Sequence, residues 1–140
     1  MSLSTRYTLD VPFFDVDSMN IVWHGHYAKY FELARCQLLD EMGFNYQTMA
    51  CEGYAFPIID LQVKYIAPLN FNQRVDVVAT LTEWEYRLKI DYQVLDHKNQ
   101  QRLSKGHTIQ VAVDAITQKM LIGSPTALVE KIERVLADNE

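Results

Sequence analysis

The stretch that decides the fold is residues 25–42, GHYAKYFELARCQLLDEM. Its apolar residues recur at intervals of three and four, which marks one face of a helix. They are Tyr27, Phe31, Ala34, Leu38 and Met42, and the stripe is widened by Tyr30, Leu33 and Leu39. A helix with so wide an apolar stripe needs more cover than a surface helix receives. We therefore expect a long helix that a larger element wraps.

The segments after residue 57 change to a period of two, which is typical of half-buried strands. Ile59, Leu61 and Val63 alternate with polar residues, and Pro68 ends this first segment. Further strands are expected over 75–81, 88–94 and 102–113, with a turn at 97–100, and an earlier strand over 7–11. Shorter helices are expected over 46–52 and from Pro125 onward. Consecutive strands without intervening helices indicate an antiparallel meander.

These elements predict an α+β fold in which one antiparallel sheet of about five strands curls around one long helix. This is the hotdog arrangement. No linker, repeat or low-complexity segment divides the chain, so residues 1–140 are expected to form a single domain.

Composition excludes several classes of protein. The formal net charge of −5 argues against a nucleic-acid binder, which needs a basic surface. No apolar run approaches the length of a membrane span, and the N-terminus lacks the apolar core of a signal peptide, so a cytoplasmic location is expected. Cys36 and Cys51 form neither a zinc pattern nor a CxxC pair, so both are expected to be reduced and buried.

A family resemblance is carried by residues 14–27, FDVDSMNIVWHGHY. The Asp-x-Asp, short turn, apolar pair, aromatic residue and helix-opening Tyr resemble the signature of the 4-hydroxybenzoyl-CoA thioesterase family, including its Tol–Pal-associated acyl-CoA thioesterase branch. The similarity extends over nearly the whole chain and includes Glu32-x-x-Arg35 and Tyr65-x-x-Pro68. The turn departs from the family, in which it often ends in Gly, but Asn20 tolerates the same left-handed backbone.

The resemblance implies that the chain hydrolyses an acyl-CoA, with Asp17 as general base or as nucleophile. Without the resemblance, an Asp in such a loop is more often a turn or capping residue. For Asp15 a structural role is expected. Glu32 could face the site or form a helix salt bridge with Arg35.

The helix start near His24 and Gly25 supplies unpaired backbone N–H groups and a positive dipole end, which would polarise the thioester carbonyl. In the resembled family the Asp and this helix start meet across a dimer interface, which makes the His24 side chain supplementary. His24-x-His26 lacks a third ligand nearby, so no metal is expected, and no redox cofactor either.

The phosphates of CoA need cationic partners. Arg87 and Lys89 alternate with apolar residues and therefore project from one face of a strand. After folding they could be joined by Lys64, Arg74, Arg102 and Lys105. An ordinary solvated sheet face explains the same pattern equally well.

The exposed edges of such a sheet predict at least a homodimer, and the family resemblance implies a homotetramer as the alternative. A non-catalytic module that binds acyl-CoA or acyl-carrier protein stays open as an alternative, because one fold hosts several activities. A hotdog dehydratase would need a His motif that this sequence does not contain. The acyl group and the thiol carrier are not specified by these residues.

Overall fold

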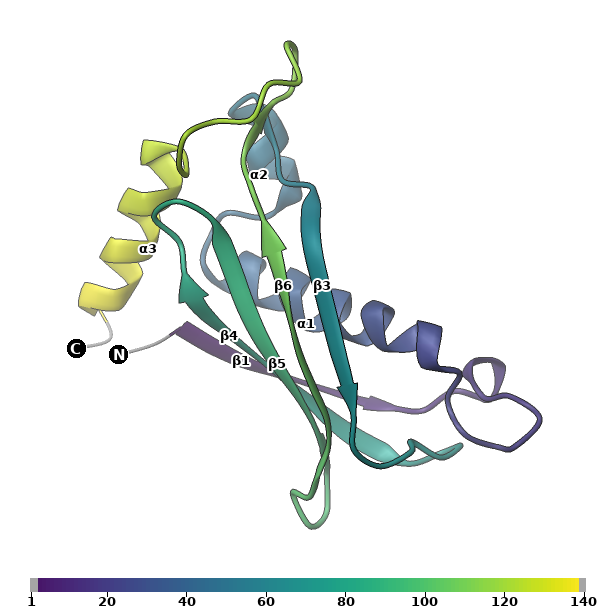
Figure 1. Cartoon of the computed structure of the whole chain (residues 1–140). Coiled ribbons are helices and arrows are strands. Elements are labelled where there is room, and N and C mark those ends of the chain that lie inside the picture. The colour runs from purple at the N-terminus through teal and green to yellow at the C-terminus, as the bar shows by residue number, and fades with distance from the viewer. Residues whose placement is uncertain (1–2, 139–140) are drawn as a thin grey trace.

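The fold is a curled antiparallel sheet that wraps one long helix, as Figure 1 shows. The computed structural model describes residues 3–138. The five-stranded sheet has the order β1-β4-β5-β6-β3, and every neighbouring pair is antiparallel. Its strands are β1 (Leu3–Asp10), β3 (Ile58–Tyr65), β4 (Arg74–Glu83), β5 (Leu88–Asp96) and β6 (Arg102–Gln110). The predicted α+β hotdog class is therefore confirmed.

The long helix α1 (Tyr27–Glu41) follows a short 3-10 turn, η2 (His24–His26), and lies against the inner face of the sheet. The five residues of its predicted apolar face are all buried, and so are Tyr30 and Leu39. Leu33 was expected to widen this buried stripe, but it is exposed, because two residues along a helix turn it to nearly the opposite side from Phe31, which packs on the sheet.

The helix approaches the sheet closely at Gly106. A Cβ atom at this position would lie 2.7 Å from Phe31 and 2.1 Å from the backbone oxygen of Gln62. Phe31 stacks on Tyr92 of the neighbouring strand, with ring centroids 4.4 Å apart. Because Gly106 has no side chain, the ring of Phe31 can contact the backbone of the inner face of the sheet.

Two strand predictions were wrong. Only β4, β5 and β6 form a meander, whereas β3 lies at the far edge beside β6 and not beside β4. The expected strand over 102–113 is interrupted, because β7 (Val113–Asp114) leaves the main sheet and pairs with β2 (Tyr54–Ala55). The short helix α2 (Tyr46–Cys51) and the C-terminal helix α3 (Thr126–Asp138) lie where the sequence predicted them.

Exposure differs from expectation at two further places. The apolar side of β3 is exposed, with Ile59 at 59% and Leu61 at 46% of their full accessibility. Cys51 is exposed and Cys36 half-buried, so the prediction that both cysteines are buried was wrong. Among residues 3–138, no helix has the length and hydropathy of a membrane-spanning segment.

Asp76 is a buried carboxylate that ties β1, β4 and the β5–β6 turn together. It accepts hydrogen bonds from Thr8 (2.7 Å), Arg6 (2.7 Å) and Gln100 (3.1 Å), and it pairs with His97 at 2.9 Å. Burial alone would raise the pKa of Asp76, but these hydrogen bonds outweigh it and hold the pKa well below its usual range.

Replacing Asp76 by Ala should lower the free energy of unfolding by about 3 kcal/mol at pH 7, because several donors lose their acceptor at once. The control Asp91→Ala, at an exposed position of β5, should change it by less than about 0.5 kcal/mol. Urea unfolding measures both.

The contribution of Asp76 to the free energy of unfolding depends on pH. Because the pKa of Asp76 is lowered in the folded state, this contribution is present above the unfolded pKa of about 4 and is lost as the pH falls below it. The gap between wild type and Asp76→Ala should therefore narrow from pH 5 to pH 3, and a gap that does not change would contradict this role.

Candidate active site

The candidate active site is a groove of about 400 Å³ between the loop that precedes α1 and the end of β3. Asp17 and His24 line it from the loop, Tyr27 from the first turn of α1, and Tyr65 and Pro68 from the far side. The structure thus brings together two of the three predicted catalytic residues, while Gly25 directly follows His24 in the chain. Their catalytic roles stay predictions.

The Asp17 loop is a closed turn. The N–H of Asp17 donates to the oxygen of Ile21 at 2.9 Å, and the side chain of Asp17 accepts the N–H of Met19 at 2.9 Å. Asn20 takes the left-handed backbone expected of it, with φ 63°. Asp17 is half-buried, so its carboxylate is fixed by the turn and still reaches the groove.

Asp15 has a different environment. Its carboxylate is buried and accepts hydrogen bonds from Lys29 and from the Tyr30 hydroxyl, the latter at 2.7 Å. Burial raises the pKa of Asp15, but the hydrogen bonds from Lys29 and Tyr30 lower it further than burial raises it. These contacts fasten the loop to α1, in agreement with the structural role expected for Asp15.

The start of the helix lies beside this groove, which His24 lines. Within residues 3–138, the N–H groups of His24 and Gly25 have no hydrogen-bond acceptor, whereas that of His26 donates to Trp23 at 2.9 Å. Free N–H groups at a helix start form a site for developing negative charge. A Cβ atom at Gly25 would lie 2.2 Å from the indole of Trp23, so the small residue lets this ring cover the turn.

Tyr65 is a site residue whose role the sequence did not reveal. Its hydroxyl donates to the backbone oxygen of His24 at 2.9 Å, and its ring packs edge-on against Tyr27. It therefore joins the end of β3 to the helix start. The Tyr65-x-x-Pro68 pattern was the available signal, but the partner lies 41 residues away in the chain.

Other predicted positions lie outside this groove. Glu32 contacts Arg35 at 3.3 Å, which favours the helix salt bridge over a place in the site, and Arg35 itself is buried against the Tyr46 hydroxyl. Arg87 is bound to Glu83 at 2.6 Å in the β4–β5 hairpin. Lys89 lies on β5, two residues from Arg87 and, within residues 3–138, without a carboxylate partner. The proposed contact of Arg87 and Lys89 with CoA stays a prediction. No group of three possible metal ligands occurs among residues 3–138.

Comparisons with known proteins identify relatives of this chain. The sequence profile of the Thioesterase-like superfamily matches residues 11–134. The acyl-CoA thioester hydrolase YbgC of Escherichia coli O157:H7 is 24% identical over 114 residues, which are 81% of this chain and 85% of YbgC. YneP of Bacillus subtilis (strain 168), named as an inferred acyl-CoA thioesterase, is 31% identical over 79 residues, so the match spans 56% of either protein.

A solved structure shows the same fold. The DHNA-CoA thioesterase from Staphylococcus aureus superposes with a TM-score of 0.85 at 24% identity, over 97% of this chain and 93% of that one. The resemblance expected from residues 14–27 is confirmed, because the profile match includes them. By this match, which covers most of its length, the chain belongs to the Thioesterase-like superfamily.

Proposed function

We propose that this chain, as one hotdog domain over residues 1–140, is an acyl-CoA thioesterase that converts an acyl-CoA into the free acid and CoA. The observation that carries the proposal is the shared groove, in which a half-buried carboxylate, Asp17, lies with the start of α1. Thioester hydrolysis needs a group that activates water or attacks carbon, and a second group that stabilises the oxyanion. The relatives named for acyl-CoA hydrolysis support this assignment.

In the proposed reaction the thioester carbonyl enters the groove with its oxygen toward the N–H groups of His24 and Gly25. Asp17 either takes a proton from a water molecule whose oxygen attacks the carbonyl carbon, or attacks this carbon itself and forms a mixed anhydride that a water molecule then hydrolyses to the free acid and the Asp17 carboxylate. As the C–S bond breaks, CoA leaves as the thiolate and takes a proton from solvent. Neither route uses a metal or a redox cofactor.

The test is an assay with a panel of short-chain, long-chain and aryl CoA thioesters, in which hydrolysis is measured by the amount of free thiol released. The thioesterase proposal expects turnover above the protein-free rate for at least one member. A non-catalytic binding module would instead show saturable binding of these thioesters with no release. The free thiols of Cys36 and Cys51 fit the reducing cytoplasm, where we place this activity.

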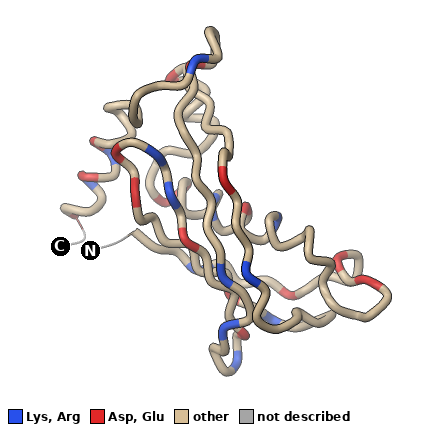
Figure 2. The backbone as a smooth tube through the Cα atoms, viewed as in Figure 1, with Lys and Arg blue, Asp and Glu red and all other residues tan. Residues whose placement is uncertain are grey.

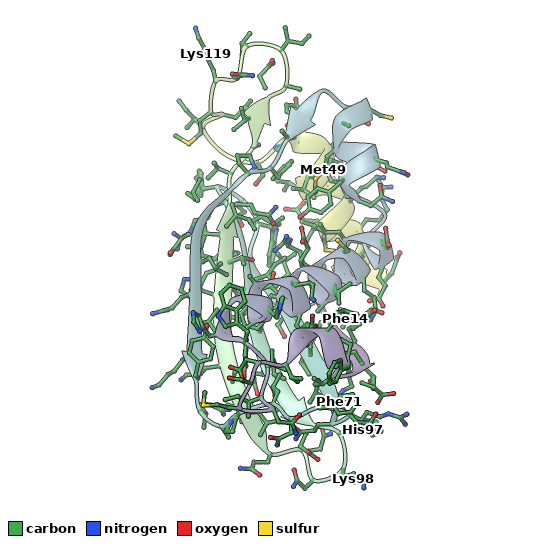
Figure 3. The ribbon with its side chains drawn as sticks, turned by 90° about the vertical axis from the view of Figure 1, so that its right-hand side faces the viewer. Phe14, Met49, Phe71, His97, Lys98 and Lys119 are labelled. Carbon is green, nitrogen blue, oxygen red and sulfur yellow. The ribbon has the colours of Figure 1, made fainter. Side chains whose placement is uncertain are left out.

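We propose that two copies pair through the free edge of β3. This edge strand exposes Ile59, Leu61 and Tyr65 on its inner side, and exposed apolar edges invite pairing with another strand. In an antiparallel pairing, the end of β3 at Tyr65 meets the start of the second copy's β3. That start borders an apolar groove of about 630 Å³, which is lined by residues including Met49 and Phe56. Phe71 contacts Phe13 in the loop that leads to Asp17 and therefore marks that end of the molecule. Met49 and Phe71 lie toward opposite ends of one copy (Figure 3), so pairing would place this apolar groove beside the Asp17 site of the other copy.

Replacing Leu61 by Lys should convert the assembly to monomers, because the charge would be buried in the paired edge. Light scattering after size exclusion measures the mass. The matched control Gln62→Lys adds the same charge one residue along, on the outer side of β3, and should leave the mass unchanged. If Leu61→Lys keeps the wild-type mass above that of one chain, or if the wild type is itself a monomer, the pairing through β3 is wrong.

A further inference from the structure

The outer face of the sheet, on the side away from α1, carries a basic hollow of about 550 Å³. It is bordered by Lys64 and Gln62 of β3, Arg102 and Lys105 of β6, and Asp91 and Gln93 of β5. Three cations and one carboxylate therefore border this hollow, although the net charge of the chain is −5. Figure 2 shows the basic positions of β3 and β6 side by side. We call these six residues the outer-face cluster.

The pairing of the strands places like charges opposite one another. Lys64 lies directly across from Lys105 in the β3–β6 register, and directly opposed like charges destabilise a sheet. At the other edge of the sheet, the charged residues that lie directly opposite each other have opposite signs. There Arg74 of β4 lies across from Asp10 of β1 and contacts it at 2.9 Å. Stability alone therefore does not explain the Lys64–Lys105 pair.

The cations of this hollow are also unpaired. Arg6, Lys29, Arg35, Arg74 and Arg87 have a carboxylate within 4.0 Å. Within residues 3–138, none of Lys64, Arg102 and Lys105 has such a partner, although the acidic residues outnumber the basic ones. Three free cations around one hollow are what an anion with several charges requires.

We propose that the outer-face cluster binds the phosphate groups of a nucleotide. Lys64, Lys105 and Arg102 would contact the phosphate oxygens. The carboxylate of Asp91 would accept hydrogen bonds from the hydroxyl and amino groups of the same ligand, and the side-chain amides of Gln62 and Gln93 would donate to its hydroxyl oxygens.

This hollow is separate from the Asp17 groove. Lys64 and Tyr65 are neighbours in an edge strand and point to opposite faces, so Tyr65 lines the groove and Lys64 the hollow. Pairing of two β3 edges would leave the outer face open. Two sources of this nucleotide have the same chemistry. One is the nucleotide end of CoA, and in that case the inference rests on the proposed function. The other is a separate nucleotide that binds to the outer face alone.

The experiment uses the full chain and two probes, inorganic pyrophosphate and 3′-phospho-ADP, with binding measured by calorimetry at low salt. The variant Lys64→Ala/Lys105→Ala should weaken the binding of both probes at least about tenfold, because two charged donors are lost. The control Lys98→Ala/Lys119→Ala removes two exposed lysines from opposite ends of the molecule and should leave binding unchanged (Figure 3). If neither probe binds saturably to the wild type, or if both double variants bind as the wild type does, the proposal is overturned.

A second measurement identifies the source of the nucleotide. If the nucleotide end of CoA occupies the hollow, Lys64→Ala/Lys105→Ala should raise KM for an acyl-CoA about tenfold and leave KM for the matching acyl-pantetheine unchanged. If a separate nucleotide binds there, both KM values stay at the wild-type level while probe binding is lost. Since probe binding does not depend on turnover, a chain that binds the probes but hydrolyses no thioester would contradict the proposed function and support the nucleotide site.

Discussion

Asp17→Asn should lower kcat for the best acyl-CoA substrate about 10³-fold, because the amide neither accepts a proton nor attacks the carbonyl carbon. The substitution keeps the shape of the side chain. Its remaining oxygen can still accept the N–H of Met19, which Asp17 binds at 2.9 Å, so the turn before α1 should persist. Steady-state release of thiol gives kcat, and the unfolding midpoint in urea shows whether the fold is unchanged.

The matched control is Asp40→Asn, which makes the same chemical change at an exposed position of α1. It should retain wild-type turnover. If Asp17→Asn and Asp40→Asn turn over equally fast on every thioester that the wild type hydrolyses, Asp17 has no catalytic role.

His24→Pro should lower kcat by about 10²–10³-fold, because it removes one backbone N–H from the helix start that we expect to stabilise the oxyanion. The backbone accommodates this change. Trp23 has φ −59° and ψ 134°, the extended conformation that a residue before proline prefers, and the first position of a helical turn tolerates proline.

His24→Ala is the companion variant, since it removes the imidazole and keeps the N–H. It should stay within a few-fold of the wild-type kcat if the side chain is supplementary. Equal losses in His24→Pro and His24→Ala would assign the effect to the imidazole and contradict the role of the backbone N–H. Far-ultraviolet circular dichroism checks that α1 is intact in both variants.

The sequence predicted what depends on local periodicity. The spacing of Tyr27, Phe31 and Ala34 indicated the buried face of α1, because side chains three and four residues apart share one side of a helix. The positive φ of Asn20 was likewise predictable, since few residues other than Gly adopt it readily. Both features depend on residues close together in the chain.

Features that depend on distant partners were not predictable. The pairing of β3 with β6 joins segments about 45 residues apart, and the alternation of apolar residues in β3 is the same at either edge of the sheet. Asp76 occupies a polar position of a strand, and only the fold reveals that Thr8 and His97 surround it. Tyr65 contacts His24 for the same non-local reason.

The candidate site was predicted in part. Asp17 and His24 lie seven residues apart, and a short turn suffices to bring both to one groove. The basic residues are different, because their partners are set by the register of the strands. Arg87 is engaged by Glu83, whereas Lys64 and Lys105 are brought together from separate strands.

The central claim is that this chain hydrolyses an acyl-CoA, and product analysis in water enriched in oxygen-18 tests it most directly. The wild type is incubated for many turnovers with the acyl-CoA that gives the fastest thiol release. Mass spectrometry then gives the mass of the free acid, and hence the number of oxygen-18 atoms in it. Our account predicts one free acid per CoA released, with one water-derived oxygen in each acid. Binding of the acyl-CoA without release of CoA above the protein-free rate would contradict it.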